Sequence, residues 1–262
     1  MPTFTSHPPG TPCWVDLSSP DVDASKAFYT AVFGWDAEDQ FEGDERVYTI
    51  FSLGGKRAAG LGGQAPGMEG MPPIWNTYIA TADCAKTAAK VTEAGGSVVL
   101  PPMQVMTAGE MAVFTDPTGA FFSVWKAGDH PGAEICNEPN TYSWNELLDR
   151  DVETAKDFYS KVFGWKYDAM DMGPAGTYNV IAGGESNGLG GLMAMPPELP
   201  DMVPNHWAVY FTVADIEDSV GKVTGNGGQV VMPPSPIPGV GTMAQLHDPA
   251  GGSFAFMQPE SG

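Results

Sequence analysis

Two acidic residues occupy equivalent positions in two predicted strands and are the first candidates for catalytic residues. Asp16 follows Trp14 by two residues, and Glu146 follows Trp144 in the same way. Side chains two residues apart on a strand point to the same side of a sheet, so each carboxyl group is expected beside an indole ring. Apolar surroundings raise the pKa of a carboxyl group, which suits proton abstraction from a carbon acid. The alternative is that each acid only accepts hydrogen bonds from the backbone or from a Trp N–H.

Other predicted strands supply further candidates for the wall of a pocket. Three pairs of residues share a strand face: Asn76 with Tyr78, Ser123 with Trp125, and Ala208 with Tyr210. His206 lies two residues before Ala208 and is a candidate general base, with a structural histidine as the alternative. Aromatic walls with a few polar groups are typical of a pocket for an organic molecule. The alternative for the tryptophans is that they belong to the core.

The chain is a tandem repeat. Four motifs recur in the same order: 28–35 (FYTAVFGW) as 158–165 (FYSKVFGW), 60–63 as 188–191 (both GLGG), 95–102 as 227–234, and 116–119 as 248–251 (Asp-Pro-x-Gly). Chance does not preserve both the motifs and their order. We therefore predict two domains, 11–126 and 141–258, joined by a linker at 127–140, with enough apolar residues in each half to bury a core.

Each half contains a weaker repeat of its own. An aspartate opens each expected helix, where it accepts free backbone N–H groups, and glycines close it. Runs rich in β-branched and aromatic residues flank the helices and predict strands. The order is a strand, a helix and about three strands, four times over, and the GLGG motifs are interpreted as turns at strand ends. The opening residues are Asp21, Asp83, Asp151 and Asp215.

These motifs together resemble those of a known superfamily. A helix that begins at Asp and ends in Phe-Tyr-x-x-Val-Phe-Gly-Trp, with Asp-Pro-x-Gly before a final strand, looks like the glyoxalase, bleomycin-resistance and extradiol dioxygenase group, or vicinal oxygen chelate superfamily. The stretch 204–211 (PNHWAVYF) is similar to its actinobacterial tandem glyoxalase-like branch, which is sometimes labelled a hydroxylase. The resemblance implies an α+β fold in which four βαβββ modules pair into two cup-shaped glyoxalase-like domains in tandem.

The resemblance also implies where a metal ion would be bound. Metal-dependent members commonly place a His seven residues before the helix-opening Asp and a Glu about seven residues after the Asp-Pro turn. Divalent metals favour imidazole or carboxylate ligands at such places, so we expect neither a metal nor another cofactor, and the residues found there become candidates for binding a substrate. They are Trp14, Asn76, Trp144 and Ala208 in the first strands, and Ser123 and Ala255 in the last strands.

The composition argues against two classes of partner. The chain has 32 Asp and Glu against 12 Lys and Arg, and a formal net charge of −20 repels nucleic-acid phosphates and anionic lipid. No apolar run is long enough to predict a membrane span, and residues 1–10 carry no secretory signal, so we expect a cytoplasmic protein. The three cysteines are widely spaced and predict neither a disulfide framework nor a zinc site.

Three functions remain open at this stage. The leading hypothesis is a metal-independent glyoxalase-like protein that binds a small hydrophobic or aromatic molecule in one or both cups. The second is an enzyme, a lyase or isomerase or a hydroxylation-related oxidoreductase, acting on a carbonyl or polyketide-like substrate through Asp16, Glu146 or His206. The third is a protein-interaction module with filled cups. Because four modules close both cups within one chain, we expect a competent monomer, with any dimer being additional.

Overall fold

The computed structural model describes residues 3–65, 67–173, 176–183 and 186–260. The first half consists of two modules, and each module is a strand, a helix and three further strands. The first module comprises β1 (Pro12–Ser19), α1 (Val22–Phe33), β2 (Asp36–Glu42), β3 (Glu45–Leu53) and β4 (Lys56–Gly63). The second comprises β5 (Ile74–Ala80), α2 (Cys84–Glu93), β6 (Ser97–Val105), β7 (Gly109–Thr115) and β8 (Phe121–Ala127).

The second half repeats this plan. Its first module comprises β9 (Thr141–Asp149), α3 (Val152–Phe163), β10 (Lys166–Asp171), β11 (Thr177–Gly183) and β12 (Ser186–Ala194). Its second comprises β13 (His206–Thr212), α4 (Ile216–Gly225), β14 (Gln229–Ile237), β15 (Gly241–His247) and β16 (Ser253–Pro259). The predicted α+β architecture of four βαβββ modules is confirmed.

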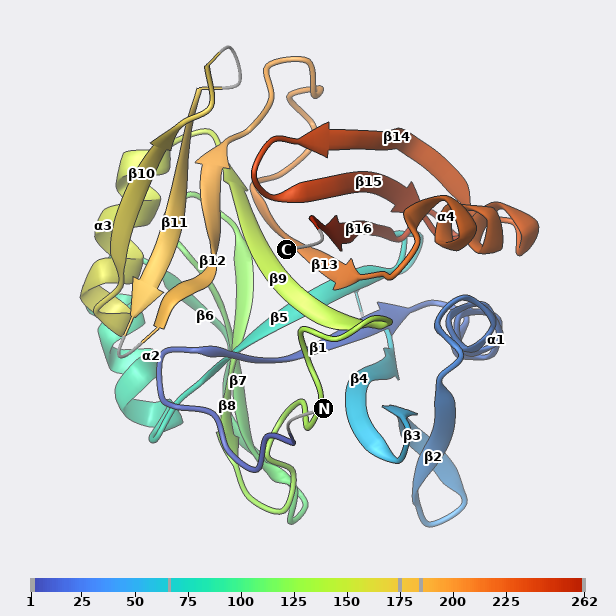
Figure 1. Ribbon diagram of the computed structural model, residues 1–262. Coiled ribbons are helices and arrows are strands. Elements are labelled where there is room, and N and C mark those ends of the chain that lie inside the picture. The colour runs from blue at the N-terminus through green and yellow to red at the C-terminus, as the bar shows by residue number, and fades with distance from the viewer. Residues whose placement is uncertain (1–2, 66, 174–175, 184–185, 261–262) are drawn as a thin grey trace.

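Each half forms one curled sheet of eight strands. The strand orders are β2-β3-β4-β1-β5-β8-β7-β6 and β10-β11-β12-β9-β13-β16-β15-β14. The first strands of the two modules pair antiparallel at the centre of each sheet, β1 with β5 and β9 with β13. In Figure 1 the first sheet lies in the lower part of the molecule and the second in the upper part, and each sheet curls into a cup.

The helices begin and end where the sequence predicts. Asp21 and Asp151 cap α1 and α3 by accepting the backbone N–H of the residue three positions later. Asp83 and Asp215 do the same for α2 and α4. Helix α1 ends at a glycine, Gly34, in the left-handed region at φ 69°, a conformation that costs other residues more. The four helices therefore carry their own start and stop signals.

The two GLGG motifs lie inside strands, which corrects their interpretation as turns at strand ends. Residues 60–63 close β4, and residues 188–191 lie within β12. The pairing also corrects their alignment, because Asp16 stands opposite Gly60 whereas Glu146 stands opposite Gly191. Gly191, and not Gly188, is therefore the structural counterpart of Gly60.

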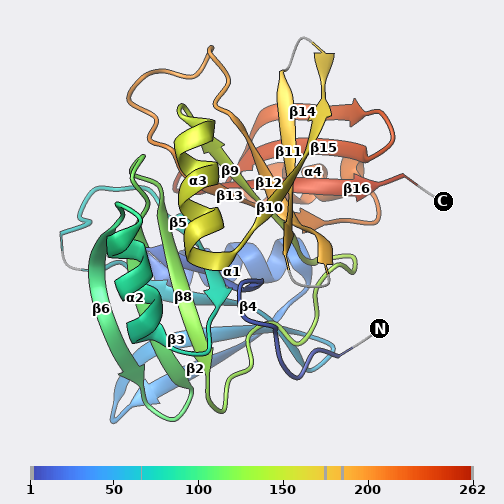
Figure 2. The ribbon, with the colours of Figure 1, turned by 90° about the vertical axis from the view of Figure 1, so that its left-hand side faces the viewer.

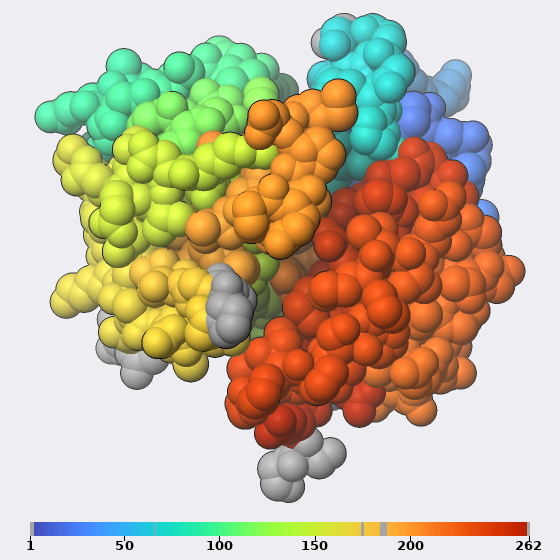
Figure 3. Space-filling model, turned by 90° about the horizontal axis from the view of Figure 1, so that it is seen from above, coloured from blue at the N-terminus to red at the C-terminus, as the bar shows by residue number. Residues whose placement is uncertain are grey.

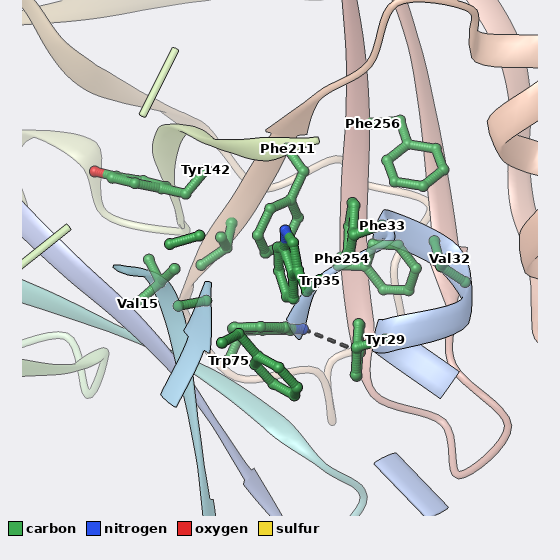
Figure 4. Packing of buried hydrophobic residues seen from close by; sticks show 14 of the residues in the cluster. Val15, Tyr29, Val32, Phe33, Trp35, Trp75, Tyr142, Phe211, Phe254 and Phe256 are labelled. Carbon is green, nitrogen blue, oxygen red and sulfur yellow. Dashed lines mark hydrogen bonds between the residues drawn. The ribbon is translucent and has the colours of Figure 1, made fainter. Parts of the chain in front are cut away.

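Neither half buries its core alone. One hydrophobic cluster combines Phe33 of α1 and Trp75 of β5 with Phe211 of β13 and Phe254 of β16, as Figure 4 shows. A second cluster combines Phe122 of β8 and residues of α2 with α3 and β12. Helix α1 contacts α4, and α2 contacts α3, the latter pair facing the viewer in Figure 2. The convex faces of the two sheets and the four helices thus form cores that both halves share. The division of the chain into two domains joined by a linker at 127–140 stays a prediction.

Two reciprocal hydrogen bonds cross between the halves. The Tyr29 hydroxyl donates to Asp248 Oδ2 at 3.1 Å, and the Tyr159 hydroxyl donates to Asp116 Oδ2 at 3.1 Å. Each aspartate uses its Oδ1 to accept backbone N–H groups of its own Asp-Pro-x-Gly turn. The repeated Phe-Tyr motif on one half is therefore joined to the repeated Asp-Pro turn of the other half.

We predict that Tyr29→Phe and Tyr159→Phe each lower the free energy of unfolding by about 1–3 kcal/mol, because a buried acceptor and a buried indole donor lose their partner. Trp75 Nε1 donates to Tyr29 and Trp207 Nε1 donates to Tyr159, at 3.1 and 3.0 Å. Urea denaturation measures the loss. The matched control is Tyr167→Phe, since the buried Tyr167 hydroxyl makes no hydrogen bond across the two halves among the described atoms. Equal stability of all three variants would contradict a cross-half role for these bonds.

Candidate functional site

A buried carboxyl group lies at the centre of the first cup, where β1 meets β5. Asp16 is 7% exposed. Its Oδ2 accepts hydrogen bonds from the hydroxyls of Tyr48 at 2.8 Å and Tyr78 at 2.9 Å, and its Oδ1 accepts from Asn76 Nδ2 at 2.8 Å. Trp14 Nε1 donates to the Tyr48 hydroxyl at 3.0 Å. The indole therefore supports the acid through a tyrosine and not directly, and all three donors to Asp16 are side chains.

The second cup repeats this cluster with one change. Glu146 is 8% exposed, and its Oε1 accepts from the Tyr210 hydroxyl at 2.8 Å. Trp144 Nε1 donates to the Tyr178 hydroxyl at 2.9 Å, and that hydroxyl is close enough to Glu146 to oppose the rise in the pKa of its carboxyl group. Ala208 stands opposite Glu146, at the place where Asn76 stands opposite Asp16. The second acid therefore lacks the amide that completes the first cluster.

Glycine makes room for one tyrosine in each cluster. A Cβ atom on Gly60 would lie 1.9 Å from the Tyr48 hydroxyl oxygen, and one on Gly191 would lie 1.8 Å from that of Tyr178. No side chain can occupy these positions while the tyrosines keep their place. The two glycines therefore let each ring lie flat on the sheet and reach the carboxyl group.

Burial raises the pKa of both acids. For Asp16 the loss of hydration outweighs the opposing hydrogen bonds from Asn76, Tyr48 and Tyr78. For Glu146 it outweighs the hydrogen bonds from Tyr210 and Tyr178. No Lys or Arg contributes to either shift among the described groups. Each carboxyl group therefore holds its proton to a higher pH than an exposed one does.

The linker after β8 fills the first cup. The His130 ring packs against Trp14 with ring centroids 4.5 Å apart and against Trp125 at 5.7 Å. Ala133 is fully buried in the same cluster as these tryptophans and Tyr78. Figure 1 shows this segment and the N-terminal segment crossing the lower cup together. Trp14 is consequently only 4% exposed.

Many backbone hydrogen bonds hold this linker in place. Gly128 and His130 donate to Ala108, Ala133 donates to Cys13, and Glu134 donates to Arg57, at 2.8–3.0 Å. Trp125 Nε1 donates to the His130 carbonyl at 2.9 Å. Burial, the Arg57 cation and His7 lower the pKa of His130 to about 4, so its ring is neutral at neutral pH. The first cup is thus closed by an anchored segment whose inserted His130 ring is uncharged.

The second cup is hollow where the first is filled. Trp144 is half-buried, and no aromatic ring among the described residues pairs with it. Figure 3 shows a hollow between the yellow and orange part of the chain on one side and the red β14 and β15 on the other. The floor of this cup is formed by β9 and β13, which carry Trp144, Glu146 and Tyr210. The two cups therefore differ in access and not in plan.

The other predicted site residues lie in the first cup, in the second cup or outside both hydrogen-bonded clusters. Ser123 pairs with Tyr78, and Trp125 contacts the linker, so both lie in the filled cup. Ala255 pairs with Tyr210 in the second cup. His206 stands opposite Leu148 at the start of β13, with its Nδ1 2.8 Å from the Pro204 carbonyl oxygen. The structure therefore does not bring His206 into the hydrogen-bonded cluster of Glu146.

Three residues of the two cups were missed from the sequence. Tyr48 and Tyr178 are donors to the acids, and the signal that could have found them is their recurrence at equivalent places in the repeat. His130 was assigned to the linker without a role. The local sequence does not indicate that the linker enters the first cup, because its position depends on contacts with residues far away in the sequence.

The side chains present do not fit a divalent metal ion. In residues 3–65, 67–173, 176–183 and 186–260, no three or more His, Cys, Asp or Glu side chains are grouped so that they could hold one. The buried carboxyl group of each cup already accepts a hydrogen bond from at least one tyrosine hydroxyl. Metal sites in proteins use several imidazole or carboxylate ligands, so we derive no step through a metal.

Paired βαβββ modules that enclose a cup are the architecture of one protein superfamily, and comparison of the sequence with family models identifies the same superfamily. The chain belongs to the Glyoxalase/Bleomycin resistance protein/Dioxygenase superfamily, whose family model matches residues 13–124 and 141–256. In the part of the chain that the structure describes, none of the helices is both long and apolar enough for a membrane span.

Several relatives are similar over nearly the whole chain. CFP32 of Mycobacterium tuberculosis, provisionally named a glyoxylase, is 42% identical over 261 residues, which cover 99% of this chain and 98% of the relative. The anthracycline biosynthesis protein DauV of a Streptomyces species (strain C5) is 36% identical over 267 residues, covering 97% and 95%.

A solved structure gives the same fold at much lower identity. The Mn(II)-bound glyoxalase from Novosphingobium aromaticivorans has a TM-score of 0.68 at 16% identity, covering 95% of this chain and 82% of that one. At this identity the likeness concerns the fold alone.

We predict that Gly60→Ala and Gly191→Ala each destabilise the protein by about 1–3 kcal/mol, because the new methyl group overlaps a tyrosine that cannot move without leaving the acid. Gly63→Ala is the control, since a Cβ there meets nothing within 4 Å. Thermal and urea unfolding provide the measurement. If Gly60→Ala were as stable as Gly63→Ala, the tyrosine would not depend on the glycine.

The raised pKa of Glu146 predicts a specific pH dependence of stability. Between the unfolded pKa, about 4.3, and the raised native pKa, the native state binds more protons than the unfolded state. This contribution is fully present below the unfolded pKa and is lost as pH rises through the native pKa. The wild type should therefore lose unfolding free energy over this window relative to Glu146→Gln. Glu42→Gln, at an exposed position of β2, should leave the pH profile unchanged. Parallel profiles for wild type and Glu146→Gln would contradict the shift.

Proposed function

We propose that this protein binds a small, largely aromatic molecule in its second cup, without a metal ion. The observation that carries the proposal is the contrast between two nearly equal clusters. The cluster of Asp16 lies beneath an anchored plug that leaves Trp14 only 4% exposed, whereas the corresponding Trp144 beside Glu146 is half-buried. An acid held by two tyrosines beneath a half-buried tryptophan offers both a stacking surface and a polar contact.

The walls of the second cup support an aromatic occupant. Met243 and Met257 alternate along β15 and β16 with core residues of the opposite sheet face, which places them on the cup side. Met193 on β12 pairs with Leu148 and is half-buried. Methionine is flexible and polarisable and makes favourable contacts with aromatic rings. Such a wall adapts to a planar ligand better than a rigid one does.

The names of the relatives are compatible with this class of ligand. Two Streptomyces relatives are named for anthracycline biosynthesis, and both align with at least 97% of this chain. Anthracyclines are aromatic compounds with carbonyl groups, which is the chemistry that the second cup would accept. This likeness supports the ligand class and not any particular compound.

A second candidate function is proton transfer on a carbonyl substrate. The specific observation that favours it is the raised pKa of Glu146, because a carboxyl group that titrates nearer neutral pH is a better general acid or base. Tyr178 and Tyr210 would orient the carboxyl group. Turnover of a carbonyl substrate that survives treatment with a chelator and is abolished in Glu146→Gln would favour this function over simple binding.

Binding is tested with 9-fluorenone, a neutral aromatic ketone, added to chelator-treated protein. We expect saturable binding in equilibrium dialysis, and we expect Trp144→Ala to weaken it about tenfold or more, because the ligand loses its stacking surface. Trp165→Ala is the control for a core tryptophan, since Trp165 is 2% exposed and lies in a shared core. It should lower stability and leave the affinity of the folded fraction unchanged.

Two results would overturn the proposal. If 9-fluorenone failed to bind the wild type at all, the second cup would not be an aromatic site. If Trp14→Ala reduced affinity and Trp144→Ala did not, binding would take place in the plugged cup. Unfolding curves recorded for every variant separate lost affinity from lost structure.

A further inference from the structure

The two buried acids differ in how fully the protein occupies them. Asp16 has three side-chain donors, and the third, Asn76, also donates to Ser18 Oγ at 2.9 Å and is fixed by both contacts. The Glu146 carboxyl accepts from Tyr210 and is influenced by the Tyr178 hydroxyl, and it has no amide donor because Ala208 takes the place of the asparagine. The carboxyl group of Glu146 therefore keeps hydrogen-bonding capacity that the carboxyl group of Asp16 has given to its neighbours.

Two residues around Glu146 are smaller than their counterparts around Asp16. Ala208 replaces Asn76, and Ala255 replaces Ser123 at the position that pairs with the second tyrosine. Both changes remove a polar group and shorten the side chain. A ligand oxygen can approach Glu146 over these two alanines, where the first cup holds an amide and a hydroxyl.

Electrostatics restricts what this oxygen can be. The groups beside the Glu146 carboxyl are Tyr178 of β11 and Tyr210 of β13. Lys166 and Asp168 of β10 and His247 of β15 lie on the same sheet face at outer strands, and none of them contributes to the pKa shift of Glu146. No Lys or Arg among the described residues shifts the pKa of Glu146, while burial raises it. An anionic ligand would find no counter-charge in the cluster, and the chain as a whole carries a formal charge of −20. A protonated carboxyl group can instead donate a hydrogen bond to a neutral acceptor.

We infer that the ligand of the second cup is a neutral aromatic carbonyl compound whose oxygen accepts a hydrogen bond from Glu146, and that the small side chain of Ala208 permits this contact. The inference rests on the proposed function and narrows it to one class of ligand. The Oε1 atom of Glu146 keeps its bond from Tyr210, and the other oxygen carries the proton toward the ligand. Trp144 provides the stacking surface beside this contact.

Three probes with related rings test the inference by calorimetric titration. They are 9-fluorenone, with a carbonyl oxygen, fluorene, without one, and 9-fluorenone-4-carboxylate, which adds a negative charge. We expect 9-fluorenone to bind about tenfold or more tightly than either of the others, because fluorene leaves the buried donor without a partner and the carboxylate finds no cation. The affinity for 9-fluorenone should also fall as pH rises and Glu146 loses its proton.

Variants assign the contact to particular residues. Ala208→Asn should remove the preference for 9-fluorenone over fluorene, because the new amide bonds to Glu146 as Asn76 does to Asp16. Ala37→Asn, the same change at an exposed position of β2, is the control and should keep the preference. Glu146→Gln retains an N–H donor and should bind 9-fluorenone with an affinity independent of pH. Glu146→Leu should lose the preference for the ketone. Should Ala208→Asn fail to fold, Ala208→Ser gives a smaller version of the same effect.

The possible results separate this inference from the function on which it rests. Binding of neither fluorene nor 9-fluorenone would overturn the proposed function. Equal binding of the two would leave an aromatic site in place and overturn the assigned contact with Glu146. Binding of the carboxylate as tight as that of 9-fluorenone would overturn the requirement for a neutral ligand. Retention of the full preference in Ala208→Asn would remove the role given to Ala208.

Discussion

The packing of each half against the convex face of the other is the constraint on which the rest of the structure depends. Phe33 of α1 and Phe254 of β16 lie in one core, and the Tyr29 hydroxyl donates across the same boundary to Asp248. Because the convex faces of both sheets are covered in this way, most of the buried apolar side chains lie on those faces. The concave faces are then free to carry polar clusters, which would be costly inside a core.

The sequence was sufficient for those features that depend on local chemistry. The capping aspartates, the left-handed glycine at 34 and the alternation that places Asp16 with Trp14 all follow from short-range patterns, whereas the pairing of modules was implied by the resemblance to a superfamily. The partners of the acids could not be predicted in the same way. Tyr48 reaches Asp16 only because Gly60 stands opposite Asp16, and this register is a property of the assembled sheet. The shared cores likewise depend on contacts between distant segments, which periodicity does not encode.

The two cups share one arrangement of hydrogen-bonded side chains, which is complete in the first cup and incomplete in the second. Both acids lie beside two tyrosines, and in both cups a tryptophan donates to one of these tyrosines. In the first cup the asparagine completes the network, and the polar groups then satisfy one another within a closed site, as buried networks must if they are to stabilise a fold. In the second cup the network is one donor short, because Ala208 takes the place of the asparagine.

The linker over the first cup can be regarded as a ligand that is covalently tethered to its own receptor. Its effective concentration is set by the chain and not by solution, and every molecule carries one equivalent. A free compound with the same contacts would have to compete with this intramolecular occupant, whose His130 ring already lies between Trp14 and Trp125. Fusion of two cup-forming halves into one chain thus supplies a permanent occupant to the first cup, and that occupant cannot diffuse away.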